Sequence, residues 1–246
     1  MCRACLSRRG ALAALGAVMA APARAETLVE PRMRLRAVPA DRLTVAITLD
    51  ACGGAFDSRI AQALVEAGIP ATLFVTGTWL AQNPAAFAML LARPDLFGFE
   101  NHGARHIPAV LGAGRVFNLA VAGRVEAVER EVMEGAAAVV AVGGAAPRWY
   151  RGATGRYSPG ALAEIARLGF VVAGYSLNGD DGAGLAPERV ARRIAAAPTG
   201  SVLLAHINHP ERPCGAGVAA GILALRARGA TFVRLDQLGP EAVEAA

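Results

Sequence analysis

The sequence predicts an α/β protein, and more closely a (β/α) barrel of about seven strands. Three observations lead to this prediction. Short apolar runs alternate with segments that have helical spacing, from residue 43 to residue 235. The connections between them are short, which is typical of parallel α/β folds. Polar residues that could act in catalysis or metal binding follow the ends of strands. Active sites of α/β barrels gather at these ends, so a barrel is favoured over an open sheet.

The first half of the expected barrel places two helices between three strands. Ile60 and Leu64 recur at helical spacing, and Gly68 stops that helix. Asn83 and Pro84 open the next helix, because proline is favoured in the first helical turn. The expected elements are a strand at 43–49, a helix from 57 or 58 to 67, a strand at 71–75, a helix at 84–92 and a strand at 96–100.

The second half continues the alternation. A stripe of valines runs along a long helix within residues 120–140, and core packing explains this stripe. Ser158 and Pro159 are typical of a helix start. The expected elements are strands at 148–151, 170–177, 201–207 and 231–235, and helices at 158–169, 187–196 and 217–228.

The first 25 residues have the pattern of an export signal. Arginines precede an apolar run at 11–21, and Ala23 and Ala25 place small residues after it. The run is about half as long as the roughly 20 residues that span a bilayer, so we expect no stable membrane span. The adjacent Arg8 and Arg9 favour a twin-arginine signal over an ordinary one. We therefore expect a periplasmic or secreted protein.

The rest of the chain is expected to form one domain. The 246 residues are 54% hydrophobic, and no linker, charge block or solenoid-like repeat divides them. We assign 1–25 to the signal, 26–42 to an N-terminal extension and 43–240 to a catalytic domain. Removal of the four arginines in 1–25 leaves 21 basic against 20 acidic residues, so no nucleic-acid partner is expected. The sequence does not determine the oligomeric state, and we expect a monomer.

Two histidines suggest a metal site. His102 and His106 are four residues apart, so they can share one face of a helix or helical turn and bind one ion. By itself such a pair can equally reflect surface accident or local packing. All four histidines of the chain, however, directly follow predicted strands, which a random scatter would seldom produce.

Other strand ends carry further candidates. Asp50 precedes a glycine-rich loop, where it can face a ligand or merely cap a turn. His206 ends an apolar strand, where its imidazole can protonate a leaving group or be a satisfied core histidine. Arg151 ends another strand, and Asp180 and Asp181 follow a further one.

The order of these segments resembles the polysaccharide deacetylase family, the NodB-homology carbohydrate esterases. That family's pattern runs Thr-Phe-Asp-Asp, Gly-Asn-His-(Ser/Thr)-x-x-His-Pro, Arg-Pro-Pro-Tyr-Gly, Asp-x-x-Asp-Trp and Leu-x-His. The corresponding segments here are 48–51, 101–106, 151–155, 178–182 and 204–206, and the resemblance covers about residues 43–238. Five segments in the same order make it far more specific than any one of them.

The resemblance implies a NodB-like distorted barrel with a divalent metal, usually zinc, at the carboxyl ends of its strands. His102 and His106 would hold the metal, and Asp50 would be the general base that activates the attacking water. His206 would be the general acid for the departing amine. Arg151 would orient Asp50, and Asp181, with Asp180 as the second choice, would orient the imidazole or the arginine.

The sequence also departs from the family pattern. Ala51 stands where the family's second Asp normally supplies the third protein ligand to the metal. Thr154 and Gly182 replace a Tyr and a Trp, which thins the aromatic groove that usually holds a sugar chain. Two histidines plus waters would then hold the metal, or Asp50 or Cys52 would take up ligation.

Two cysteines, Cys52 and Cys214, remain after the signal. Thiolate is a good zinc ligand, so Cys52 can complete the metal site. In an oxidising compartment the two can instead form a disulfide, and we expect the disulfide. His209 is expected at the rim of the site.

The predicted function is therefore an exported, metal-dependent hydrolase that removes N-acetyl groups from an acetylated amino-sugar polymer or oligosaccharide. Substitution of the groove aromatics leaves a hydrolase of another amide or ester as an alternative. Loss of the Asp at position 51 leaves a catalytically silent carbohydrate-binding domain as another.

Overall fold

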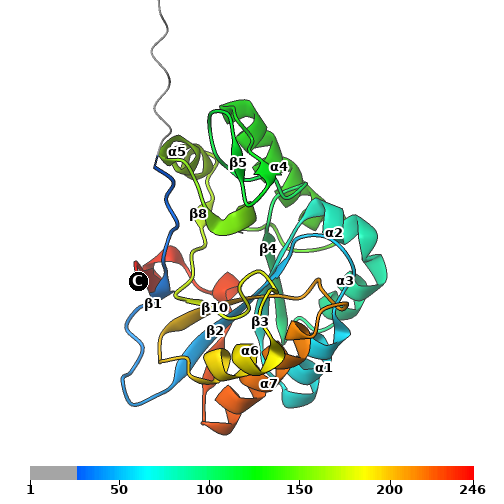
Figure 1. The fold of residues 1–246 in the computed structure, drawn as a ribbon, viewed down its shortest axis with the longest axis vertical. Coiled ribbons are helices and arrows are strands. Elements are labelled where there is room, and N and C mark those ends of the chain that lie inside the picture. The colour runs from blue at the N-terminus through cyan, green and yellow to red at the C-terminus, as the bar shows by residue number, and fades with distance from the viewer. Residues whose placement is uncertain (1–26) are drawn as a thin grey trace, which may run out of the picture.

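Ten strands within residues 27–246 form one curled, mostly parallel sheet, as expected for the distorted barrel (Figure 1). A computed structural model describes residues 27–246, so the expected signal at 1–25 lies outside the described residues. The main strands are β2 (Thr44–Ala51), β3 (Ala71–Val75), β4 (Phe97–Asn101), β7 (Trp149–Tyr150), β8 (Val171–Val172), β9 (Leu177–Asn178), β10 (Ser201–His206) and β11 (Thr231–Val233). Strand β2 lies at the centre and pairs in parallel with β10, β3 and β11. The α/β barrel prediction is confirmed.

The barrel is incomplete on one side. The path runs from β10 through β2, β3, β4 and β7 to β8, while β9 pairs with β10 at the other end. Within residues 27–246 no ladder joins β8 to β9, although they follow one another in the chain. The expected strand at 170–177 is thus two short strands separated by an irregular segment, and the sheet stays open there.

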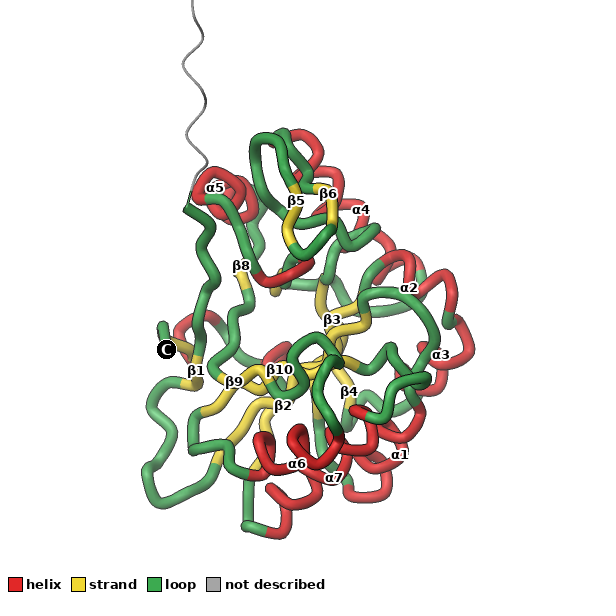
Figure 2. The backbone as a smooth tube through the Cα atoms, viewed as in Figure 1, coloured by secondary structure: helices red, strands yellow, loops and turns green. Residues whose placement is uncertain are grey.

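Helices cover the outer face of the sheet (Figure 2). They are α1 (Ser58–Ala67), α2 (Gly77–Gln82), α3 (Pro84–Leu91), α4 (Val125–Ala141), α5 (Pro159–Arg167), α6 (Pro187–Ala195) and α7 (Cys214–Ala227). Asp57 caps α1, and Gly68 ends it in the left-handed conformation at φ 62°. Ser158 caps α5 as expected. Helix α2 had no counterpart among the expected elements.

Strand β2 separates two cores, because successive side chains point to opposite faces of a sheet. Val45, Ile47 and Leu49 pack with α1 and α7 in the outer core. Ala46 faces the barrel interior, where it packs with Phe74 among others. The same alternation turns the following even-numbered positions of β2 toward the interior, and this places the catalytic candidates.

The N-terminal segment joins the sheet. Strand β1 (Arg34–Leu35) pairs antiparallel with β10 and with the C-terminal β12 (Val243–Glu244), and Val29 forms an isolated bridge with Tyr157. Residues 27–35, expected as part of an extension, therefore contribute to the wall of the barrel. A two-stranded hairpin, β5 (Arg115–Val116) and β6 (Leu119–Ala120), was not expected from the sequence. Within residues 27–246, no helix combines the length and apolar character needed to cross a membrane.

Candidate active site

A cavity of about 790 Å³ opens at the carboxyl ends of the parallel strands. The candidate site residues predicted from the sequence contribute to its wall, except Arg151 and Asp180, which lie buried behind it. Its wall includes Asp50, Cys52, His102, His106, Thr154, Asp181, His206 and His209.

Asp50 is fixed by Arg151. Nη1 of Arg151 donates to Oδ1 of Asp50 over 2.8 Å and to Oγ1 of Thr48 over 2.9 Å. The rest of the guanidinium donates to the carbonyls of Ala173 and Gly174 and lies over the ring of Phe74. Four hydrogen bonds and a stacked ring therefore hold this buried cation in one orientation. The expected contact between Arg151 and Asp50 is present.

The backbone of Arg151 also orients His102. Nδ1 of His102 lies 2.6 Å from the carbonyl oxygen of Arg151. A carbonyl oxygen only accepts, so Nδ1 carries a hydrogen, and when the ring is neutral its Nε2 presents a lone pair to the cavity. Nε2 lies 3.8 Å from Oδ2 of Asp50 and 3.4 Å from Sγ of Cys52.

His106 reaches the cavity from an irregular loop after β4, not from the expected helical turn. Buried Glu131 of α4 braces this loop, since its Oε1 accepts from the backbone N–H groups of Arg105 and Ile107. A Cβ at Gly103 would lie 2.4 Å from that same oxygen, so this position requires glycine. His106 itself has φ 63°, a strained conformation for a side-chain-bearing residue. In this backbone conformation the centre of its ring lies 5.0 Å from that of the His102 ring.

Asp180, not Asp181, holds His206. Oδ2 of Asp180 accepts from the backbone N–H of His206 over 2.7 Å, and Oδ1 lies 2.9 Å from its Nδ1. Asp180 is fully buried, whereas Asp181 is exposed and has φ 54°. The prediction that favoured Asp181 is wrong, because the chain turns into a left-handed conformation at 181 and carries that side chain away from the imidazole.

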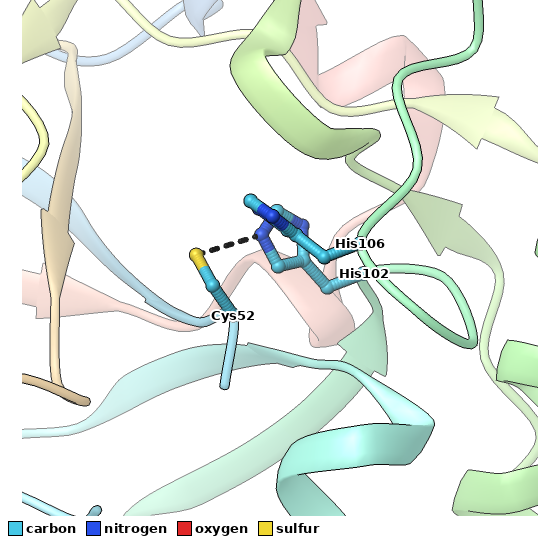
Figure 3. Close-up of side chains that lie close together, drawn as sticks. All are labelled: Cys52, His102 and His106. Carbon is cyan, nitrogen blue, oxygen red and sulfur yellow. Dashed lines mark hydrogen bonds between the residues drawn. The ribbon is translucent and has the colours of Figure 1, made fainter. Parts of the chain in front are cut away.

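The expected disulfide is absent, and both cysteines are free. Cys214 is buried at the start of α7, where Asp57 is one of its charged neighbours. Cys52 points into the cavity instead, and Figure 3 shows its sulfur directed toward His102 and His106. Both cysteines follow neighbouring parallel strands, but closeness of strand ends does not decide where their side chains point.

The charges of the site are coupled. Burial alone would raise the pKa of Asp50, but Arg151 and the nearby imidazoles outweigh it and lower the pKa. Burial would likewise raise the pKa of Cys52, and the histidines, chiefly His102, hold it well below its ordinary value. Burial lowers the pKa of His206, but Asp180 outweighs burial and raises it well above the usual range. Cationic neighbours thus shift the Asp50 carboxyl and the Cys52 thiol toward their charged forms.

The donor atoms suit a divalent metal. Ligand atoms of Cys52, His102 and His106 all lie within 4.8 Å of one another. Two imidazoles and a sulfur form a set that zinc accepts. The hydrogen bond from Nδ1 of His102 to a backbone carbonyl is the usual support of a metal-binding imidazole. These residues therefore fit the ion that the resemblance implies.

A family comparison decides the classification. The model of the family described as polysaccharide deacetylase matches residues 37–173. The match includes Asp50, His102, His106 and Arg151, while Asp180 and His206 lie beyond it. The chain belongs to the polysaccharide deacetylase family.

Solved structures agree with this fold. The chain is similar to BA3943 from Bacillus anthracis, described as a CE4 family pseudoenzyme, with 16% identity, a TM-score of 0.65 and coverage of 81% of this chain and 66% of that one. It is also similar to the family 4 carbohydrate esterase from Streptomyces lividans in complex with acetate, with 19% identity, a TM-score of 0.63 and coverage of 85% and 98%. A third similar structure is described as a T48 deacetylase with substrate. It has 22% identity and a TM-score of 0.64, and the match covers 82% of this chain and 93% of that one. No curated protein matches the chain.

Within this member of the polysaccharide deacetylase family, several site residues were not predicted. Nothing in the sequence marked Glu131 as a site residue, because the valine stripe of its helix indicates only core packing. Phe117, at the tip of the β5–β6 hairpin, lines the cavity and is 66% exposed. His209, expected at the rim, lies in the wall of the cavity and contacts Glu211 through Nδ1 over 3.0 Å.

Proposed function

We propose that the protein is an exported, metal-dependent hydrolase that removes N-acetyl groups from an acetylated amino-sugar polymer or oligosaccharide. One observation carries this proposal. Asp50 and His206 occupy partnered register positions on the neighbouring strands β2 and β10, and each has its own buried partner. A carboxylate and an imidazole with separately tuned pKa values are what acid–base hydrolysis needs.

Asp50 acts as the base. Its Oδ1 is occupied by Arg151, which leaves Oδ2 to take a proton from the attacking water. The lowered pKa of Asp50 keeps the carboxylate charged at neutral pH. Arg151 thus holds the base both in its charged form and in position.

His206 acts as the acid. Asp180 accepts the Nδ1 hydrogen, so Nε2 is the atom that gives its proton to the departing nitrogen. The raised pKa of His206 keeps the imidazole protonated until that step. Without this proton the amine would have to leave as an anion, which is the difficult part of amide hydrolysis.

His102 and His106 would hold the divalent metal, for which zinc is the best candidate. When bound, such an ion polarises the acetyl carbonyl and stabilises negative charge that develops on its oxygen. Arg151 and Glu131 serve this site indirectly, since they orient His102 and the loop that carries His106.

An exposed aromatic ring at the edge of the cavity supports a glycan substrate. Phe117 lies at its edge with one face of the ring backed by the guanidinium of Arg156, 4.6 Å away. The ring remains 66% exposed, so its other face can stack on the C–H face of a sugar. Phe117 and Asn118 both have positive φ, as a two-residue type I′ turn requires, and a phenylalanine tolerates this poorly. A bulky ring kept there at a conformational cost supports a binding role.

Export rests on the pattern of residues 1–25, and periplasmic or secreted localisation is part of the proposal. The solved structures are too distant in sequence to supply more than the fold. Ala51 in place of the usual Asp keeps the catalytically silent binder as the competing function. The organised pairs Asp50–Arg151 and His206–Asp180 favour the enzyme, because sugar binding alone needs neither.

Acetate release is the direct test. We expect acetate from N-acetylglucosamine oligomers or from peptidoglycan fragments with added zinc or cobalt, and little after chelation. A parallel panel of small acetylated amides and esters separates glycan specificity from a general amidase or esterase. Stoichiometric metal without acetate release from any substrate would favour the silent binder.

A further inference from the structure

Strand alternation places Cys52 where it can supply the third metal ligand that Ala51 cannot supply. Ala51 is fully buried in the outer core with α1 and α7, so its side chain faces away from the cavity. Asp50 and Cys52 flank it and share the opposite, inward face. An aspartate introduced at position 51 on this backbone would enter an apolar core, whereas the cysteine one residue later enters the site.

The distances around Cys52 match a ligand set. In a tetrahedral zinc site, Zn–S and Zn–N bond lengths put neighbouring ligand atoms about 3.5 Å apart. Sγ of Cys52 lies 3.4 Å from Nε2 of His102, and the farthest ligand atoms of the three residues are within 4.8 Å. In the neutral form that binds a metal, His102 presents a lone pair there, because its hydrogen is on Nδ1 and is donated to the carbonyl of Arg151.

Asp50, the alternative third ligand, is already assigned as the base in the proposed function. Arg151 already donates to Oδ1 of Asp50. If Asp50 completed the metal site, the cavity would lose the base that the proposed function assigns to it. A ligand from Cys52 leaves Asp50 free, and three protein ligands leave one position open, as in catalytic zinc sites.

We propose that the Cys52 thiolate is the third protein ligand of the metal, which makes this a Cys–His–His centre. The inference rests on the proposed function for the presence of a metal, but it concerns the donor set alone. A thiolate is a soft ligand, so the site selects zinc or cobalt over magnesium, calcium and manganese.

Cobalt spectroscopy of the full chain tests the donor set without relying on turnover. A thiolate bound to Co²⁺ gives an intense near-ultraviolet charge-transfer band, which nitrogen and oxygen ligands do not give. We expect this band in the wild type and in Cys214→Ser, the matched cysteine control, and its loss in Cys52→Ser. Zinc affinity should fall at least about tenfold in Cys52→Ser, since loss of supporting contacts alone costs that much.

A second variant guards against simple misfolding. Cys52→Asp should bind zinc more tightly than Cys52→Ser while still lacking the charge-transfer band. Stoichiometric cobalt in the wild type without the band would overturn the proposal, as would equal zinc affinity in the wild type and Cys52→Ser. Absence of any bound cobalt or zinc in the folded wild type would overturn it as well.

Acetate release measured on the same samples separates this inference from the proposed function. Turnover by wild type that lacks the band leaves the hydrolase and removes the thiolate ligand. The band without turnover on any acetylated substrate leaves the Cys–His–His centre and removes the hydrolase.

Discussion

Nη1 of Arg151 donates to Oδ1 of Asp50 over 2.8 Å, and both side chains are almost completely buried. A buried charge pair of this kind persists only because each charge also has other polar partners. Thr48 and two backbone carbonyls supply them for the guanidinium. This pair therefore sets both the position and the charge state of the proposed base.

Substitution Arg151→Lys should weaken catalysis and move the acidic limb of the pH–rate profile. Lysine keeps the charge but not the planar donors that contact Asp50 and the two carbonyls. Arg151 lowers the pKa of Asp50 through its charge and its hydrogen bond, and lysine does not reproduce that hydrogen bond, so the pKa rises and the carboxylate is protonated at a higher pH. We expect kcat/KM to fall about 100-fold from misplacement of the base and the acidic limb to shift upward. An unchanged limb in a folded variant would argue against Asp50 as the base.

Asp180 and Asp181 offer a matched pair of neighbouring carboxylates. Asp180→Asn should lower kcat by about 100-fold or more, because an amide no longer holds the Nδ1 hydrogen of His206 as a carboxylate does. Asp180 raises the pKa of His206, so the variant imidazole loses its proton at lower pH and the alkaline limb moves downward. Asp181→Asn should stay within about twofold of wild type, since Asp181 is exposed. Equal effects of the two substitutions would contradict the assignment of Asp180.

Phe117 should affect the binding of long substrates. Phe117→Ala should raise KM for an acetylated oligosaccharide about fivefold, as the loss of roughly 1 kcal/mol of stacking predicts, with kcat little changed. Turnover of a small acetylated ester should not change. Met89→Ala is the control, because Met89 is 50% exposed on α3 and does not line the cavity. A fall in kcat with KM unchanged would place Phe117 outside substrate binding.

Glu100 should make the fold less stable in alkali. Burial is the main cause that raises its pKa to about 8, although its Oε2 accepts from the backbone N–H groups of Arg148 and Trp149. The folded state therefore binds the proton more tightly than the unfolded chain, whose reference pKa is 4.5. The stabilisation is complete below pH 4.5 and is lost as the pH rises to about 8, by a few kcal/mol.

Substitution Glu100→Gln keeps the oxygen acceptor and removes the titration. The free energy of unfolding, measured with denaturant between pH 5 and pH 9, should decline less steeply in this variant than in the wild type. Parallel curves for the two proteins would show that Glu100 is ionised in the folded state at neutral pH.

The main site residues could be predicted because they sit at strand ends. Asp50 and His206 end buried apolar runs, and parallel strands bring such ends to one edge. The choice between Asp180 and Asp181 could not be made in the same way. It depends on a left-handed residue in an irregular turn, which the sequence there does not specify.

Cys52 shows a second limit of sequence reasoning. Its proposed role depends on how far the alternation of side chains between the two faces of β2 continues. The end of that alternation decides whether residue 51 or residue 52 faces the cavity. The hairpin that carries Phe117 was missed because its turn is Phe-Asn, not the Asn-Gly or Asp-Gly that marks such turns. In each case backbone geometry outside regular periodicity determines the result.

We expect Asp50, His206, His102 and His106 to act together in the hydrolysis of an N-acetyl group. The most direct measurement is acetate release from an N-acetylglucosamine oligomer by zinc-loaded wild type and Asp50→Asn, at equal measured zinc content. We expect turnover by the wild type and a rate lower by about 100-fold or more in the variant. Acetate release that is equal in the two proteins, or absent from the zinc-loaded wild type on every acetylated glycan, would contradict it.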